Sequence, residues 1–227
     1  MVGSLENDLQ ILTKLLSIVI ASCPDDAHLI EQQADSAMAM LLQRLLAGRL
    51  YEGWNLFRGF SKRFRDEYEA DLDAEGQAAV QSLRRYFGSS NSLLAQVRNK
   101  IGFHADRSMA EATYEKLSET EDLGSYICDT LGNTLHITPE LMHYETICEI
   151  TKENNYLNAM NILWNDTQNR VSEFNKVLNS FTVLFAIRYL PDAISQLKTE
   201  YDDVHAEPMS SFQLRFFSDL SELQRPD

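Results

Sequence analysis

Apolar residues in this chain recur at spacings of three and four, and this periodicity constrains the fold more than any other feature. The first such series is Leu5, Leu9, Leu12, Leu16 and Val19. These spacings place side chains on one face of an α-helix, whereas a half-buried strand requires strict alternation. Only nine glycines and five prolines interrupt the 227 residues, and helix-forming residues dominate. The sequence therefore predicts an all-α fold.

The expected helices form an antiparallel bundle followed by further helices. Pro24 ends the first helix, because a residue before proline avoids the helical region. Four antiparallel helices with short connections make a bundle in residues 1–122, and residues 123–227 make a C-terminal helical extension packed on it. The predicted helices run from Ser4 to Cys23, from Asp25 or Asp26 through Phe64, over 78–87, from Ser90 or Asn91 into the residues before Asp106, from Asp106 or Ser108 to Leu117, over 141–151, 156–190 and 192–204, and for a short stretch after Ser210 or Ser211.

One segment, residues 121–139, departs from helical periodicity. Tyr126-Ile127-Cys128 and Leu135-His136-Ile137 flank Gly132-Asn133, so this segment is expected to form a small hairpin or an irregular loop. Thr138 followed by Pro139 then restarts a helix, since proline suits the first helical position.

The end of the second predicted helix carries a basic stripe. Arg58, Lys62 and Arg65 share one face, and Phe57, Phe60 and Phe64 share another. Such a stripe can guide an RNA backbone. A solvent-facing side of an amphipathic helix has the same pattern, so both interpretations stand.

Composition and charge limit the classes of function. Three cysteines without a framework spacing indicate reduced thiols in a cytosol. The longest apolar stretch, 15–23, is too short to span a bilayer, and the first twenty residues lack the basic start of a signal peptide. A cytoplasmic protein without a membrane partner is expected.

The net charge of −14 disfavours broad, non-specific nucleic-acid binding. The charge is unevenly distributed, however. Residues 44–107 carry eleven basic and eight acidic side chains, a balance of +3, whereas the rest of the chain has a balance of −17.

The less acidic segment contains an arginine and a histidine six residues apart, Arg98 and His104. Arginine holds phosphate with a forked, permanently charged donor set. Histidine accepts and donates protons near neutral pH. Together these two residue types can position and cleave a phosphodiester without a metal.

A structural interpretation of the same residues rests on helix geometry. Leu94, Val97, Ile101 and His104 fall on one stripe, so His104 can be a hydrogen-bonded histidine at the edge of a core. On an ideal helix Arg98 and His104 lie about 120° apart. A shared site therefore needs a distortion at Gly102, a weak helix former, or a second copy of the helix facing the first.

The stretch Arg98-Asn99-Lys100-Ile101-Gly102-Phe103-His104-Ala105-Asp106 resembles the R-x4-6-H signature of the HEPN family, in the version found in abortive-infection-type members. These are helical domains of bacterial toxins, abortive-infection proteins and other RNA-processing enzymes. The resemblance covers the bundle of residues 4–122. A tyrosine that some family toxins carry two places after the histidine is missing here, so regulation through it is not implied.

The resemblance implies a metal-independent endoribonuclease of a bacterial defence or toxin–antitoxin system, with the ribose 2′-hydroxyl as nucleophile and no cofactor. His104 is the implied general acid or base, Arg98 stabilises the transition-state charge, and Asn99 orients His104 or the phosphate. Predicted RNA-binding residues are Lys100, Arg58, Lys62 and Arg65. The implied partners are RNA, a second copy of the chain in a homodimer, and an antitoxin protein.

A second hypothesis is a non-catalytic helical dimerisation or interaction protein that retains the bundle. Two further sets of residues bear on the site. Tyr51, Glu52 or Arg49 of the second predicted helix is expected to face the motif, and the sequence does not choose among them. Zinc is disfavoured, because the candidate ligands lack the paired spacing of structural zinc sites. These candidates are Cys128, His136, His143 and Cys148.

Overall fold

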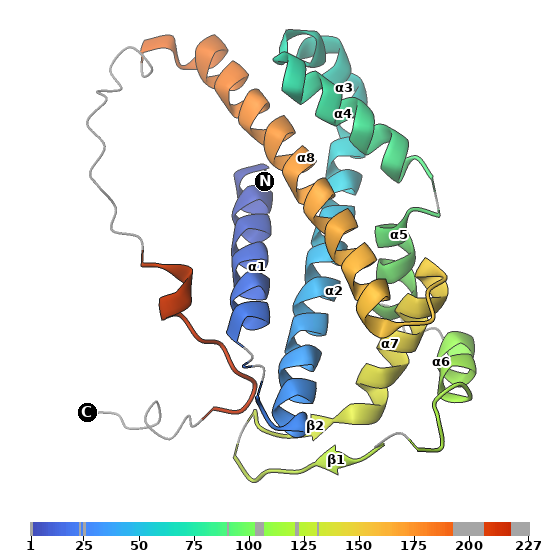
Figure 1. Cartoon of the computed structure of the whole chain (residues 1–227). Helices are drawn as coiled ribbons and strands as arrows, with labels where there is room; N and C mark the ends of the chain where they lie inside the picture. The colour runs from blue at the N-terminus through green and yellow to red at the C-terminus, as the bar shows by residue number, and fades with distance from the viewer. Residues whose placement is uncertain are drawn as a thin grey trace.

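The computed structural model describes residues 2–22, 24, 26–89, 91–102, 107–120, 123–130, 132–192 and 207–218. Within these ranges α-helices predominate and the only sheet is a two-stranded hairpin, which confirms the all-α prediction (Figure 1). The helices are α1 (Val2–Ser22), α2 (Leu29–Gly59), α3 (Ser61–Glu67), α4 (Ala74–Phe87), α5 (Leu93–Val97), α6 (Arg107–Tyr114), α7 (Ile137–Thr151) and α8 (Tyr156–Tyr189), with the short turns η1 (Glu69–Asp71), η2 (Arg98–Gly102) and η3 (Met209–Ser211).

The two longest predicted N-terminal helices pack against each other as an antiparallel pair, α1 and α2 (Figure 1). The stripe predicted from sequence lies at their contact, where Leu9, Leu16 and Met40 are fully or almost fully buried. At Gly53 the helices approach so closely that a Cβ atom would lie 2.8 Å from a methyl group of Leu5. The absence of a side chain at this position therefore sets the spacing of α1 and α2.

The longest helix, α8, has 34 residues and spans about 51 Å. It crosses the molecule diagonally and packs along α4 (Figure 1). Asp73 caps α4 by accepting a hydrogen bond from the backbone N–H of Gly76 at 2.7 Å. A Cβ atom at Gly76 would lie 2.6 Å from the hydroxyl of Ser180 on α8, so this glycine permits the close approach of the two helices.

The main hydrophobic core draws on both sides of the boundary predicted at residue 122. Leu46 and Leu83 from the N-terminal part contribute to the same buried cluster as Ile147, Leu163 and Phe174 from α7 and α8. The C-terminal helices therefore complete the core that α1, α2 and α4 begin.

The hairpin expected around Gly132-Asn133 is present. Strands β1 (Ser125–Tyr126) and β2 (Leu135–His136) pair antiparallel, with Ser125 opposite His136. A second, smaller buried cluster holds the hairpin against the start of α2, and Phe216 and Phe217 of the C-terminal segment pack on it. Asn133 exchanges two hydrogen bonds with the backbone of Ser218, at 2.9 and 3.1 Å.

Three sequence-based expectations about helices are corrected. The second helix does not run through Phe64, because α2 ends at Gly59 and α3 begins at Ser61. The fourth helix is short and passes into a π-helical turn at Arg98. Residues 212–218 contain no helix where the last helix was predicted, and the short turn η3 ends at Ser211, before that stretch. The helix predicted over 192–204 falls almost wholly outside the described residues.

None of the helices in the described part of the chain combines the length and the apolar character that a membrane span requires.

Candidate active site

The candidate motif lies where α5 changes its helical geometry. Leu94, Val97 and Ile101 are buried at 0, 0 and 9% exposure, which confirms the first three positions of the predicted stripe. Residues Arg98–Gly102 form a π-helical turn, a distortion often found at functional sites. A distortion at Gly102 was one of the two ways predicted from the sequence for Arg98 and His104 to share a site, and this turn includes Gly102. His104 itself lies outside the described residues.

Arg98 is held on three sides by neighbouring side chains. Its Nη2 atom donates a hydrogen bond to Glu52 of α2 at 3.1 Å, and its Nη1 atom donates one to Asn99 at 3.1 Å. The guanidinium carbon lies 5.2 Å from the centre of the Tyr51 ring, within cation–π distance. Of the three candidates on the second helix, Glu52 and Tyr51 thus face the motif, whereas Arg49 forms a hydrogen bond to Asp8 of α1 at 2.7 Å.

The fixed guanidinium retains donors for a ligand. The Arg98 side chain is 24% exposed and that of Glu52 is 46% exposed, so the pair lies at the protein surface. Each terminal nitrogen carries two N–H groups, and Glu52 and Asn99 use one each. The Nε atom is buried and has no hydrogen-bond partner among the described residues. Arg98 can therefore bind a phosphate oxygen while Glu52 and Asn99 hold it in place.

The basic stripe does not continue into the Arg98 site. Arg58 is exposed near the end of α2, and the break at Phe60 separates it from Lys62 and Arg65 on α3, which are also exposed. Arg58 comes six residues after Glu52, about 120° around the helix. No hydrogen bond or ion pair between described residues joins these three cations to Arg98. Asn99 is exposed and Lys100 is half-buried beside Arg98 in the turn.

The break at Phe60 also changes the predicted aromatic face. Phe57 and Phe64 remain packed together, with their ring centres 4.6 Å apart. Phe60 is separated from this pair and is 59% exposed. Gly59, a weak helix former at the end of α2, precedes the change in backbone direction.

The four candidate zinc ligands have separate surroundings. The imidazole of His143 lies 2.9 Å from a guanidinium nitrogen of Arg44, and His136 contacts Ser125 at 2.9 Å. Cys128 is exposed in the hairpin, and Cys148 is buried in the core, where burial raises the pKa of its thiol. Within the described ranges no three histidine, cysteine or acidic side chains come together as metal ligands.

Comparison with protein families, with curated proteins and with solved structures finds no significant match to this chain.

A polar layer behind the motif was not predicted from the sequence. The Tyr86 hydroxyl of α4 accepts a hydrogen bond from the Leu94 backbone N–H at 3.1 Å, in the first turn of α5. It donates a short hydrogen bond to Asp166 of α8. Arg170 lies 4.5 Å over the Tyr86 ring. Since the Ser92 side chain makes no capping bond, Tyr86 provides the cap that an N-terminal serine normally would.

This layer is substantially desolvated. Burial raises the pKa of the Tyr86 hydroxyl, and the hydrogen bond to Asp166 raises it further. Burial also raises the pKa of the Asp166 carboxyl above its ordinary value of 3.8, although Tyr86 and Arg170 oppose the shift. The one sequence signal was the i, i+4 and i, i+3 spacing of the charged residues Asp166, Arg170 and Glu173 in a helix of mixed polarity. Their partners, far away in the chain, could not be predicted.

Proposed function

We propose that this chain is a metal-independent endoribonuclease that cleaves RNA through the ribose 2′-hydroxyl, in a bacterial defence or toxin–antitoxin system. The observation that carries the proposal is the fixed, surface-exposed guanidinium of Arg98. Glu52 and Asn99 hold it at 3.1 Å each in a π-helical turn, just before the histidine of the motif. An oriented arginine with free N–H groups is suited to binding a phosphodiester.

The reaction needs one base, one acid and one stabilised phosphoryl group. His104 accepts the proton of the 2′-hydroxyl, whose oxygen then forms a bond to phosphorus. The bond from phosphorus to the 5′-oxygen breaks, and this oxygen receives a proton from a second acid, such as His104 of a second copy. Arg98 binds the non-bridging oxygens and stabilises their additional negative charge. The products carry a 2′,3′-cyclic phosphate and a 5′-hydroxyl.

The remaining parts of the proposal concern partners and location. Lys100, next to the Arg98–Asn99 pair, and the exposed cations Arg58, Lys62 and Arg65 are proposed to contact the RNA backbone. Two copies of the chain are proposed to bring two motifs together, and an antitoxin protein to restrain them. The proposed location is the cytoplasm, where the RNA substrates are found.

The first test is cleavage of labelled total RNA or tRNA in EDTA. His104→Ala should lose at least about 100-fold in rate, because general acid–base catalysis contributes that much or more. Arg98→Gln should lose about 100- to 1,000-fold, because it removes charge stabilisation of the transition state. Arg49→Gln is the matched control, since it also breaks an arginine–carboxylate contact of α2 but one directed at α1, and its activity should stay within about twofold of wild type.

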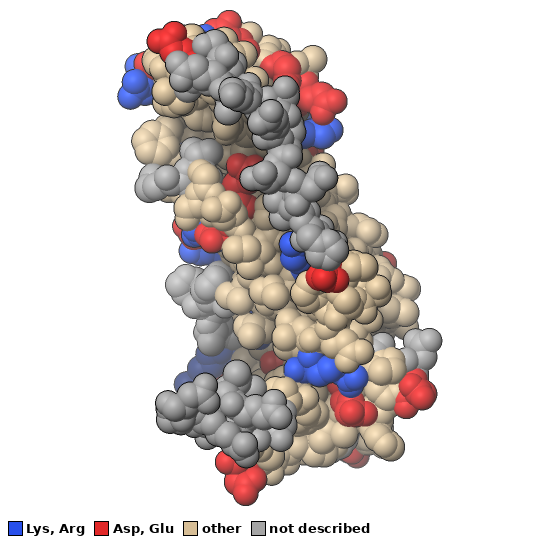
Figure 2. Space-filling model, turned by 90° about the vertical axis from the view of Figure 1, so that its left-hand side faces the viewer, with Lys and Arg blue, Asp and Glu red and all other residues tan. Residues whose placement is uncertain are grey.

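The second candidate is a non-catalytic interaction protein. Two observations favour it: the Glu52 carboxylate partly neutralises Arg98, and uncharged side chains cover much of the face on which α1 lies (Figure 2). On α1, Ile11 and Ile20 are 56% and 55% exposed. If wild type leaves RNA intact, or if His104→Ala cleaves as fast as wild type, the nuclease proposal fails and this candidate takes its place.

A further inference from the structure

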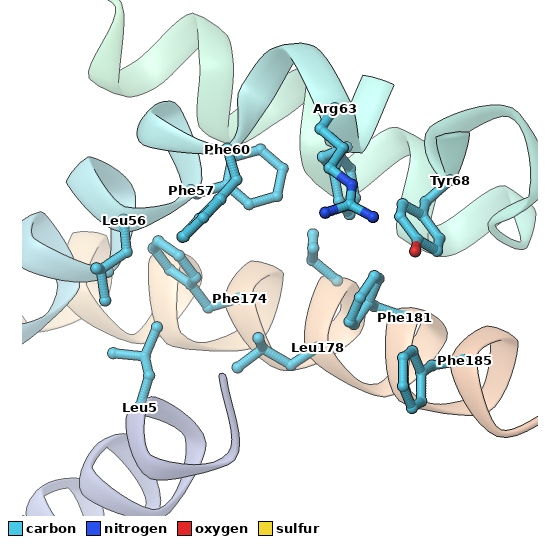
Figure 3. A pocket seen from close by; sticks show the side chains of 13 residues that line it. Leu5, Leu56, Phe57, Phe60, Arg63, Tyr68, Phe174, Leu178, Phe181 and Phe185 are labelled. Carbon is cyan, nitrogen blue, oxygen red and sulfur yellow. The ribbon is translucent and has the colours of Figure 1, made fainter. Parts of the chain in front are cut away.

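A cavity of about 370 Å³ lies between α1, α2, α3 and α8, away from the Arg98 site (Figure 3). Its volume falls in the range of small-molecule sites, which are mostly apolar with a few polar groups. More than half of its lining residues are aromatic, namely Phe57, Phe60, Phe64, Tyr68, Phe174, Phe181 and Phe185. Phe60 and Phe185 remain 59% and 42% exposed, so the cavity opens to solvent beside them.

Arg63 is the only charged residue among the described residues that line this cavity. Its Nε atom donates to both carboxylate oxygens of Glu67, at 3.1 Å each. The terminal nitrogens, Nη1 and Nη2, donate no hydrogen bond to any described residue. The guanidinium is directed toward the space between α3 and α8 (Figure 3). Two N–H-bearing nitrogens are therefore available at the cavity.

The two polar lining side chains lie toward one end of the cavity, which Phe181 and Phe185 also line (Figure 3). Leu5 and Leu56 lie at one end, and Arg63 and Tyr68 lie at the other (Figure 3). A linear ligand with an apolar tail and one anionic group matches this arrangement. At about 30 Å³ per water-sized group, the cavity holds about twelve non-hydrogen atoms.

We propose that this cavity binds a single-chain amphiphile with an anionic head group, of the chemical class of a fatty acid. The apolar chain lies between Leu5 and Phe181, and the carboxylate binds the terminal nitrogens of Arg63. This site does not depend on the nuclease proposal, because it shares no side chain with the Arg98 cluster.

The unpaired N–H groups of the Arg63 terminal nitrogens favour this ligand over an occupant that presents apolar side chains alone. A helix or a second copy that covered the cavity with apolar side chains alone would desolvate these donors without pairing them, which is unfavourable. A carboxylate satisfies them with a charge-assisted bond. The anionic amphiphile is thus the occupant that fits both the walls and the rim.

The test is calorimetric titration of the full chain with dodecanoate below its micelle concentration. Wild type should bind one equivalent. Arg63→Gln should weaken binding about three- to fivefold, because the guanidinium is largely exposed at 73% and such charge contacts are modest. Arg65→Gln is the matched control, since Arg65 lies on the same helix and outside the cavity, and its affinity should equal that of wild type.

A second variant, Leu56→Trp, tests the position of the chain. Leu56 is half-buried and lines the cavity, so a larger side chain there should occupy part of the space for the apolar chain and weaken binding at least tenfold, with the folded state checked by its thermal unfolding. A different hollow of about 800 Å³ lies between α1, α2, α7 and α8, and Leu56 does not line it. Loss of binding in this variant therefore assigns the ligand to the smaller cavity.

Three results would overturn the proposal. Wild type would show no saturable binding of dodecanoate, or Leu56→Trp would bind it as tightly as wild type. The third is equal affinity for dodecyltrimethylammonium, a cation of the same chain length, which would mean that Arg63 does not select the head group.

Discussion

At the scale of single residues, one hydroxyl group joins three helices. Tyr86 on α4 caps α5 through the Leu94 backbone and bonds Asp166 on α8. The candidate motif helix therefore begins at a point that is fixed by side chains from two other helices. The carboxyl of Asp166 is mostly removed from water, and this has a consequence for stability against pH.

Replacing Asp166 by Asn should change the pH dependence of folding. Because burial raises the pKa of this carboxyl above 3.8, the folded state keeps its proton to a higher pH than the unfolded state. The contribution of Asp166 to stability is thus fully present below about pH 4 and is lost as pH rises through the folded-state pKa. Asp166→Asn retains an oxygen acceptor for Tyr86 and cannot titrate.

Urea unfolding of both proteins between pH 3.5 and about 7 measures this effect. The free energy of unfolding of Asp166→Asn, relative to wild type, should rise with pH across this window and then become constant. A difference that stays flat over the window would mean that the Asp166 carboxyl is not desolvated.

At the scale of secondary-structure elements, the end of α7 is held in an unfavourable conformation. Lys152 follows α7 with φ 61° and ψ 33°, in the left-handed region, where glycine is normally preferred. It is the only residue other than glycine with positive φ in the described part of the chain. Lys152 lies in the short connection between the end of α7 and the start of α8.

Replacing Lys152 by Gly should stabilise the protein by about 0.5–1 kcal/mol, because glycine adopts this conformation without strain. For a chain of this length the melting temperature should rise by about 1–4 °C. Lys152→Ala is the control, since it removes the same side chain and keeps the Cβ atom. If Ala stabilises as much as Gly, loss of the lysine charge and not relief of strain is responsible.

The sequence predicted which segments are helical better than it predicted where the helices end and which neighbours their side chains contact. The stripe beginning at Leu5 and the long run after Tyr156 gave helices close to those observed, since burial on one face determines them. The break at Phe60 was missed because Gly59 differs little from Gly48 and Gly53, which α2 accommodates.

The same limit applied to the candidate site. Arg49 and Glu52 are three residues apart on α2, about 60° around the helix, so both could face the motif. Only the packing of α2 against α1 and α5 separates them, with Arg49 directed at Asp8 and Glu52 at Arg98. That Arg98 and His104 share one site stays a prediction, because His104 is outside the described residues.

At the scale of the whole molecule, the C-terminal segment is tied to the first half of the chain. Arg215 lies 2.6 Å from a carboxylate oxygen of Asp35, whose side chain is only 4% exposed. The backbone N–H of Phe216 bonds the other oxygen at 2.9 Å. The backbone N–H of Leu214 donates to Ser22 at the end of α1 at 3.1 Å.

Replacing Arg215 by Ala should cost about 2–4 kcal/mol of unfolding free energy, because it leaves the buried Asp35 charge without its cation. Arg107→Ala is the control. It breaks a pair with Glu111 in which the arginine is 92% exposed, so it should cost less than about 1 kcal/mol. In urea unfolding, the double variant Asp35→Ala/Arg215→Ala should be less destabilised than the sum of the single variants. Exact additivity would mean that the two side chains are not coupled.

The long helix α8 also determines how the molecule comes apart. It contacts α1, α2, α4, α5 and α7, and its buried residues belong to the same core as theirs. Detaching α8 would expose that core along most of its length: α1 and α2 would remain packed on each other, but α4 would lose its main partner. We therefore expect hydrogen exchange in α4 and α8 to follow one shared opening event, because each loses its packing when the other departs.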